Sequence, residues 1–454
     1  MKNTNKDLTQ GNIYKILVIF ALPLCATYFL QLMYSTVDMA IVGKYIGEAG
    51  VAAISSSSEI INLYTFFCIG FCNGGQALIA QLIGLKNKSR FNEAIQTLLI
   101  SSLILGVIIC LLTICFRSDI LTLLKVPQES FVMAKDYLFI CSIGLLFSFG
   151  YNAVTICFRA FGDSKHALKF VIISTIVNIV LDFVLVAYFN MGIIGAAIAT
   201  LIGQMLSFIL AINSFAKTSL YPEYTYKLTD LKYNFEDLKV MLKIGLPLAI
   251  QSAIVHFSML YVNRLINNLG VSAAAAFAIG IKIDDICAKT SLGFQYAGGP
   301  IISQNFVSNN YKRVKKTVLA IWLIAGVAHI IYALFYFFFA KEMFSLFIKD
   351  GSIEVLNLSN QFVRSIIWTF IPLALLRGVN ALYIGIGNGK LSLYFSLLDS
   401  VVGRIGFSLL FGYVLNGGFA GFVLGYGLAP LGAVIPGIIY FISGKWKSFK
   451  KLAQ

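Results

Sequence analysis

The sequence repeats itself. The tripeptide LPL at residues 22–24 returns at residues 246–248, and Val37-Asp38 returns as Val262-Asn263. The two copies lie about 224 residues apart. The match continues downstream, where Gly70, Gly74, Gly75 and Gln81 correspond to Gly293, Gly298, Gly299 and Gln304. A duplication at nearly fixed spacing predicts that each half is one structural unit.

The repeat is built from apolar segments. The chain is 58% hydrophobic and 12% charged, whereas soluble domains carry about 25% charged residues. Segments of about 20 apolar residues can cross a bilayer. They predict transmembrane helices at 13–43, 47–80, 91–116, 131–158, 167–190, 192–216, 240–267, 271–306, 314–340, 355–384, 391–416 and 418–443. The predicted fold is an all-α polytopic membrane protein with twelve transmembrane helices in two pseudo-symmetric six-helix bundles. Parallel repeats of this kind are typical of transporters with a site within or between the halves.

The predicted helices group into two lobes. We expect an N-terminal lobe at 1–216, a cytoplasmic linker at 217–239 and a C-terminal lobe at 240–454. Lysine and arginine are concentrated in the loops on the side of the termini, and the opposite loops hold only Lys44, Arg117, Lys125, Lys135, Lys341 and Lys349. Because cytoplasmic loops are rich in basic residues, both termini are predicted to be cytoplasmic, in the plasma membrane of a bacterium.

The sequence contains no signature of catalysis or of a resident cofactor. We find no HExxH, GxSxG or P-loop motif, any of which would position a metal, a nucleophile or a phosphate. The eight cysteines lie in predicted spans and do not resemble a disulfide framework. The net charge of +15 comes mostly from loops, with no soluble basic surface that would bind nucleic acid. We therefore expect a monomer that is not an enzyme and has no cofactor. Its predicted partners are a small-molecule substrate and membrane lipids.

Ionisable residues inside membrane spans are costly and mark transport pathways or proton relays. In the first half, Asp38 lies roughly 9 Å and Asp182 roughly 12 Å from the outer ends of their helices, at about 1.5 Å per residue. Thr200 has nearly the depth of Asp182, and Asn178 shares a helix face with Asp182 because the two are four residues apart. These four side chains predict a site for a proton or a sodium ion, since carboxylates bind hard cations and close carboxylates share protons. The alternative is that the two acids only hydrogen-bond neighbouring helices.

The second half lacks this set. Asn263 replaces Asp38, and Gly403, Phe407 and Gly425 replace Asn178, Asp182 and Thr200. The second half instead carries a charge network of His256, Arg264, Lys282, Asp284, Asp285, Lys289, Arg377, Asp399 and Arg404. We expect Arg377 to pair with Asp399, because both fall near the middles of consecutive helices. The network either lines a cavity or only holds helices together.

Two prolines suggest a conformational role for the first helix of each half. Pro23 and Pro247 sit at equivalent points of these helices, where each can kink its helix. A kink before Asp38 would couple ion binding to a gate, and the alternative is a static bend. We expect the substrate cavity or gate to include Pro23, Gln31, Tyr34, His256, Lys282, Asp285, Arg377, Asp399 and Arg404.

Four stretches carry a family resemblance. QLMYSTVDMAIVG (31–43), FRAFGDSKHAL (158–168), VNIVLDFVL (177–185) and MGIIGAAIAT (191–200) resemble the multidrug and toxic compound extrusion (MATE) family over essentially the whole chain. The chain looks like the branch of DNA-damage-inducible protein F and its multidrug relatives in Gram-positive bacteria. The resemblance implies a secondary active antiporter that exports amphipathic small molecules by alternating access, in exchange for H⁺ or Na⁺. The family's first-lobe cation residues match Asp38, Asn178, Asp182 and Thr200.

One departure from the family bears on the substrate. Members that export cationic drugs are expected to have an acidic cavity, whereas the second half of this chain carries several arginines and lysines. An exporter of an anionic or zwitterionic metabolite or peptide is therefore an alternative. A lipid-precursor flippase is a further one.

Overall fold

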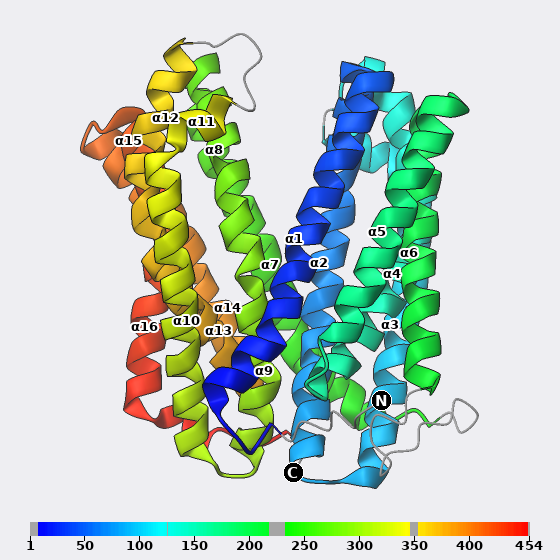
Figure 1. Cartoon of the computed structure of the whole chain (residues 1–454), viewed down its shortest axis with the longest axis vertical. Helices are drawn as coiled ribbons and strands as arrows, with labels where there is room; N and C mark the ends of the chain where they lie inside the picture. The colour runs from blue at the N-terminus through cyan, green and yellow to red at the C-terminus, as the bar shows by residue number, and fades with distance from the viewer. Residues whose placement is uncertain (1–7, 125, 218–231, 346–352, 453–454) are drawn as a thin grey trace. The chain divides into compact units, whose positions relative to one another are not determined.

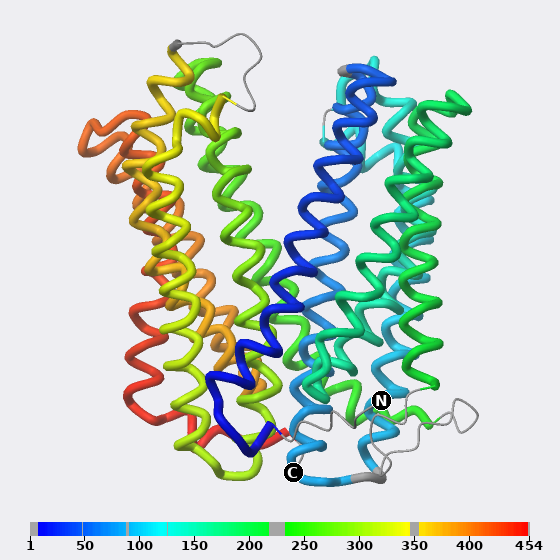
Figure 2. Tube along the Cα trace, in the orientation of Figure 1, coloured from blue at the N-terminus to red at the C-terminus, as the bar shows by residue number. Residues whose placement is uncertain are grey.

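The computed structural model describes residues 8–124, 126–217, 232–345 and 353–452, all in helices and short connections. Most of the expected linker, at 218–231, lies outside the described residues, as do Lys125 and Lys349. The chain divides into two compact units. Unit 1 contains Ala26–Ala249, and unit 2 contains Leu8–Cys25 together with Ile250–Leu452. Figure 2 follows the chain through both units as one helical trace.

Unit 1 is a bundle of long helices (Figure 1). Its apolar segments form helices because their backbone hydrogen bonds are then satisfied within each segment, as a membrane requires. The bundle is completed by the second part of α1 and the first part of α7. Its elements are α1 (Ile13–Tyr45), α2 (Glu48–Gly84), α3 (Lys88–Leu123), α4 (Gln128–Ala160), α5 (Lys165–Asp182), η1 (Phe183–Tyr188), α6 (Gly192–Lys217) and α7 (Phe235–Asn267).

Unit 2 contains more breaks in its helices. The expected span 271–306 is divided at Ser291 into α8 and α9, and the expected span 418–443 is divided at Pro430. The elements are α8 (Val271–Thr290), α9 (Leu292–Val307), α10 (Tyr311–Phe338), α11 (Ala340–Ser345), α12 (Ile353–Ile366), η2 (Ile367–Thr369), α13 (Phe370–Ile386), α14 (Gly389–Leu397), η3 (Leu398–Phe407), η4 (Leu410–Val414), α15 (Gly418–Leu428), α16 (Leu431–Ser443) and η5 (Lys445–Ser448).

The described residues include eleven helices that are long and apolar enough to cross a membrane. The eleven correspond to all the expected spans except 271–306, which α8 and α9 fill in succession. The predicted all-α polytopic membrane fold is confirmed.

The units differ from the expected lobes at two helices. The first part of α1, up to Cys25, belongs to unit 2, although α1 opens the first half of the sequence. The first part of α7, up to Ala249, belongs to unit 1 in the same way. In unit 2, Leu17 and Phe20 of α1 are buried in one apolar cluster with Ile301 of α9 and Val318 of α10. The opening segment of α1 is therefore part of the hydrophobic core of unit 2.

Candidate functional site

The two acidic side chains of the first half meet inside unit 1. Asp38 on α1 and Asp182 at the end of α5 are both buried, at 6% and 0% exposure. Their carboxyl groups lie within hydrogen-bonding reach of each other. Two carboxylates cannot occupy such a position with both charges uncompensated, because desolvation and mutual repulsion favour protonation or a bound cation.

The oxygens of this pair have little other compensation. Both oxygens of Asp182 and Oδ1 of Asp38 accept no hydrogen bond from an N–H or O–H group of the described chain. Buried polar atoms normally have partners, and each exception calls for an explanation. A proton held between the carboxyl groups, or a cation bound by them, supplies the partner that the protein itself does not.

Hydroxyl groups surround the acids. The Tyr34 hydroxyl on α1 lies 3.2 Å from Oγ1 of Thr200 on α6. Tyr137 on α4 also comes within hydrogen-bonding reach of Thr200, and Cys141 one turn later reaches Tyr137. Thr200 is thus tied to two tyrosines. Reasoning from the sequence missed the contribution of α4, because neither Tyr137 nor Cys141 carries charge.

Amides line α5 and α6 close to the acids. Asn178 is one turn before Asp182, and neither its oxygen nor its nitrogen has a hydrogen-bond partner in the described chain. Gly203 allows α6 to approach Asn178 of α5 closely, because a Cβ on Gly203 would lie 3.3 Å from Cβ of Asn178. Gln204, one turn after Thr200, has a buried Oε1 that is also without a partner among the described residues. Gln204 could have been found from its four-residue spacing to Thr200.

The backbone changes geometry directly after Asp182. The α-helix ends at this residue and continues as the wider π-helix η1. Single π turns inside α-helices occur frequently at functional sites. The site therefore combines two acids, two amides and three hydroxyls from α1, α4, α5 and α6, which is the oxygen chemistry suited to H⁺ or Na⁺.

Close backbone packing occupies the equivalent positions of unit 2. Gly403 stands where the first half has Asn178, and a Cβ on it would lie 2.4 Å from the carbonyl oxygen of Ala429. Gly425 stands in place of Thr200, and a Cβ there would lie 2.4 Å from the amide nitrogen of Ser408. At these positions the second half therefore lacks both the polar side chains of the first half and the space for them.

Asp399 pairs with Arg404, and the expected pairing with Arg377 is wrong. The two groups are both buried, with Nη2 of Arg404 at 3.5 Å from Oδ2 of Asp399. They lie five residues apart in the π-helix η3. A π-helix places residues i and i+5 in line, so a pattern based on 3.6 residues per turn misses this pair. Arg404 also donates to Oγ of Ser258, at 3.1 Å, and its guanidinium lies over the ring of Tyr426.

Arg377 forms hydrogen bonds to residues at the break between α8 and α9. Its Nε donates to Oγ of Ser291 at 3.0 Å, and its Nη2 donates to the carbonyl oxygen of Ala288 at 2.6 Å. Both partners lie where α8 ends. Backbone groups freed by a helix break inside a membrane need partners, and this buried arginine supplies one.

Of the two neighbouring acids in α8, the structure buries Asp284. It is 8% exposed, and its Oδ1 has no hydrogen-bond partner in the described chain. Asp285 forms a partly exposed ion pair with Lys289 at 2.9 Å, and its expected place in the cavity or gate stays a prediction. Lys282 is exposed. The buried carboxyl of α8 is thus the neighbour of the predicted residue.

The remaining predicted residues lie at exposed or half-buried positions. Gln31 and Arg264 are exposed, while Pro23 and His256 are half-buried. Pro23 lies in the part of α1 that belongs to unit 2. Their roles in a cavity or gate stay predictions.

Comparison with known proteins places these features in a family. The MatE family model matches residues 23–184 and again residues 247–435, so the internal repeat is also a repeat of the family domain. The chain is 27% identical over 455 residues to "Probable multidrug resistance protein YpnP" of Bacillus subtilis (strain 168), with 99% of each chain covered. It is 24% identical to "Multidrug export protein MepA" of Staphylococcus aureus (strain bovine RF122 / ET3-1), covering 87% of this chain and 86% of that protein.

Solved structures agree on the fold. An outward-facing multidrug resistance MATE family transporter of the MOP superfamily superposes with a TM-score of 0.90 at 22% identity, covering 98% of this chain and 99% of that one. The similarity extends over nearly the full length of both proteins. The family domain is matched twice, and the chain belongs to the MatE family.

Proposed function

We propose that this protein is a secondary active antiporter that exports amphipathic small molecules in exchange for H⁺ or Na⁺ by alternating access. The observation that carries the proposal is the contact between Asp38 and Asp182, in which three of the four carboxyl oxygens have no other hydrogen-bond partner in the described chain. An ion that binds here contacts carboxyl oxygens that otherwise have no partner. The contacts within the site therefore differ between the ion-bound and ion-free states. A coupling site of an antiporter needs this property.

The ion site is assigned to the first half. Asp38 and Asp182 exchange the ion, and Asn178 and Thr200 supply neutral oxygens. Tyr34 and Tyr137 orient Thr200 through their contacts with its hydroxyl. The negative charge of the buried carboxylates favours binding of a cation, and the amide and hydroxyl oxygens supply the remaining ligands.

We assign substrate recognition to unit 2, with Asp284 as the counter-charge of a cationic substrate. Asp284 is the buried acid of α8 with an oxygen that has no partner among the described residues. The side chains of Arg377 and Arg404 are engaged by Ser291, Ala288, Asp399 and Ser258. The names of the relatives from Bacillus subtilis and Staphylococcus aureus, which refer to multidrug resistance and export, support an amphipathic substrate.

A second candidate is an anionic or zwitterionic substrate. Nε of Arg404 is buried and donates to no acceptor in the described chain. It could therefore still donate a hydrogen bond to an anionic group. This candidate makes the opposite prediction for substrate charge.

Purified protein in proteoliposomes tests the proposal. Vesicles with an imposed pH gradient or an imposed sodium gradient are offered ethidium, as an aromatic cation, and an aromatic sulfonate dye, as an anion. Gradient-dependent flux of ethidium supports the first candidate, and flux of the sulfonate alone supports the second. Chemical conversion of a substrate in the absence of any gradient would contradict both candidate functions.

We also propose that both termini face the cytoplasm. Cysteine introduced at Lys447, which is exposed in η5, should react with an impermeant maleimide only after the cells are opened. Cysteine introduced at Tyr188, which is 79% exposed at the end of η1, should react in intact cells. The reverse pattern would contradict the orientation.

A further inference from the structure

The first helix of each half changes unit at an equivalent residue. α1 leaves unit 2 after Cys25, and α7 leaves unit 1 after Ala249. These two residues are related by the same spacing that relates Pro23 to Pro247. The opening segment of each helix is therefore built into the unit formed by the other half of the sequence.

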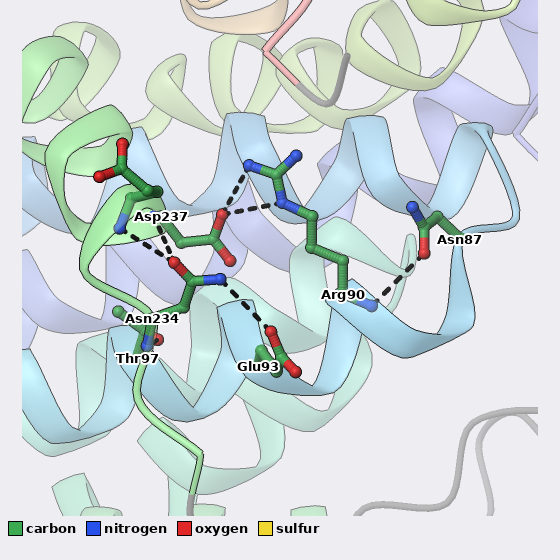
Figure 3. Close-up of polar contacts among 7 residues, drawn as sticks. Asn87, Arg90, Glu93, Thr97, Asn234 and Asp237 are labelled. Carbon is green, nitrogen blue, oxygen red and sulfur yellow. Dashed lines mark hydrogen bonds and ion pairs between the residues drawn. The ribbon is translucent and has the colours of Figure 1, made fainter.

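An arginine fastens the start of α7 to unit 1. Arg90, in the first turn of α3, donates from Nε at 3.0 Å and from Nη2 at 2.8 Å to Oδ1 of Asp237, in the first turn of α7 (Figure 3). The side chain of Asp237 is fully buried. Both hydrogen bonds end on the same carboxylate oxygen, and hydrogen bonds between ionised groups are short and strong.

The segment before α7 is held by the same face of α3. Asn234 caps α7 by accepting from the amide of Asp237, and its own side-chain nitrogen donates to Glu93 at 3.3 Å (Figure 3). The amide of Asn234 donates to Oγ1 of Thr97 at 3.0 Å. These contacts position the cap, and they leave the start of α7 with little freedom to move on α3.

A second arginine fastens the start of α1 to unit 2. Arg313 occupies the third position of α10, as Arg90 does in α3, and each follows a capping asparagine three residues earlier. Arg313 donates to three carbonyl oxygens just before α1, at 3.2 Å, 2.5 Å and 2.7 Å, which belong to Leu8, Gln10 and Gly11. Asn305 adds a fourth bond, 3.1 Å to the carbonyl of Leu8.

Glycines mark the other end of both fastened segments. A Cβ on Gly70 of α2 would lie 2.6 Å from the amide nitrogen of Ala249. A Cβ on Gly293 of α9 would lie 2.5 Å from the amide nitrogen of Cys25. These two glycines are equivalent in the repeat. Each of these two segments is therefore hydrogen-bonded to an arginine at its start and packed against a glycine at the residue where its helix leaves the unit.

We propose that Arg90 and Arg313 are repeat-related positioning residues for transport, which hold the starts of α7 and α1 while both helices bend where they leave these units. This inference rests on the alternating access of the proposed function. Asp38 lies thirteen residues beyond Cys25 along α1. A change in the carboxyl pair therefore acts on a helix whose opening segment cannot follow it, and the bend at Pro23 and Cys25 absorbs the difference.

A double-mutant cycle tests the first fastening. We compare Arg90→Gln, Asp237→Asn and the double variant, with Lys239→Gln as the control, because Lys239 is 71% exposed in the first turn of α7. Each single variant should lower thermal stability, and the double variant should recover it. In the double variant, maximal ethidium export should remain about tenfold below the wild type, which equals roughly 1.4 kcal/mol of barrier. Its ethidium Kd should not change. A double variant that recovers export together with stability would overturn the proposal.

A substitution that keeps the charge of Arg313 but changes the arrangement of its hydrogen-bond donors tests the second fastening. Arg313→Lys keeps the charge but not the several fixed donors of the guanidinium, so export should fall with unchanged ethidium Kd. Lys312→Gln, an exposed neighbour, is the control. Wild-type export by Arg313→Lys would overturn the assignment of this residue.

Hydrogen exchange separates this inference from the proposed function. The wild type and the Asp38→Asn variant are compared without any substrate, so the result does not depend on transport. Exchange should differ after Cys25 in α1 and stay equal before it. A profile without a step at Cys25 overturns the fastening, whereas a wild type that shows no gradient-driven flux overturns the proposed antiport alone.

Discussion

At the scale of single residues, the carboxyl pair in unit 1 determines what the protein can exchange. Asp38 and Asp182 face each other without other donors for three of their four oxygens. With both groups ionised, a bound cation must balance the repulsion, and without a cation the pair must hold a proton. Under the proposed function, H⁺ and Na⁺ would therefore bind at the same place.

The first prediction concerns Asp38. Asp38→Asn should abolish coupled export while the protein remains folded in the membrane, because an amide can neither share the proton nor neutralise a cation. Gradient-driven ethidium flux in proteoliposomes measures this loss. Asp136→Asn is the matched control, since Asp136 is an exposed carboxylate of α4 next to Tyr137. Wild-type flux in Asp38→Asn would remove this residue from the ion site.

The second prediction concerns Arg404. Replacing it with Gln leaves the buried Asp399 without its ionic partner, which should cost about 3–5 kcal/mol. Asp399→Asn added to Arg404→Gln should recover most of the loss in thermal unfolding, whereas Asp399→Asn added to Arg377→Gln should not. Rescue of the Arg377 variant would restore the pairing first expected from the sequence.

At the scale of helices, the sequence predicts what repeats regularly and misses what interrupts the repeat. Counting residues from helix ends placed Asp38, Asp182 and Thr200 at similar depth, and the structure brings them into one cluster. The same counting paired Arg377 with Asp399, because nothing in the sequence marks η3 as a π-helix. The break at Ser291 was also missed, since apolar residues continue on both sides of it.

The crossing of α1 and α7 between units could not be predicted either. It depends on which surface buries Leu17 and Phe20, and hydrophobic periodicity gives the buried face of a helix without naming its partner. Only the equivalence of Pro23 and Pro247 hinted at a special point in these helices.

The third prediction is at this scale. Gly293→Ala forces a Cβ to within 2.5 Å of the backbone of α1 at Cys25, and overpacking of this kind costs typically 1–3 kcal/mol. Gly326→Ala in α10 meets nothing within 4 Å, so it should be neutral or gain up to about 1 kcal/mol of helix propensity. Thermal unfolding of the two variants in detergent compares them directly. Equal stability would mean that the contact at Cys25 is not tight.

At the scale of the whole molecule, duplication has produced two halves with one fold and different chemistry. Two of the positions that we propose bind the ion in the first half are equivalent to Gly403 and Gly425 in the second, where packed backbone fills the space. Any side chain introduced at Gly403 would disturb the packing there. A substitution at Phe407, which replaces Asp182, is therefore a better control for the second half than a substitution at Gly403. The second half keeps a buried acid of its own in Asp284. In the proposed function, the ion and the substrate therefore act on different units of one protein.

The last prediction tests this division by separating coupling from substrate affinity. Asp182→Asn should abolish gradient-driven ethidium export and leave the ethidium Kd unchanged, since the ion site lies in unit 1. Asp284→Asn should raise the ethidium Kd about tenfold, roughly 1.4 kcal/mol, and export should still respond to the gradient at saturating ethidium. Phe407→Leu, at the position equivalent to Asp182, should alter neither. Fluorescence titration and flux measured on the same preparations supply both quantities. Equal sensitivity of Kd and flux at Asp182 and Asp284 would show that the two halves share one site.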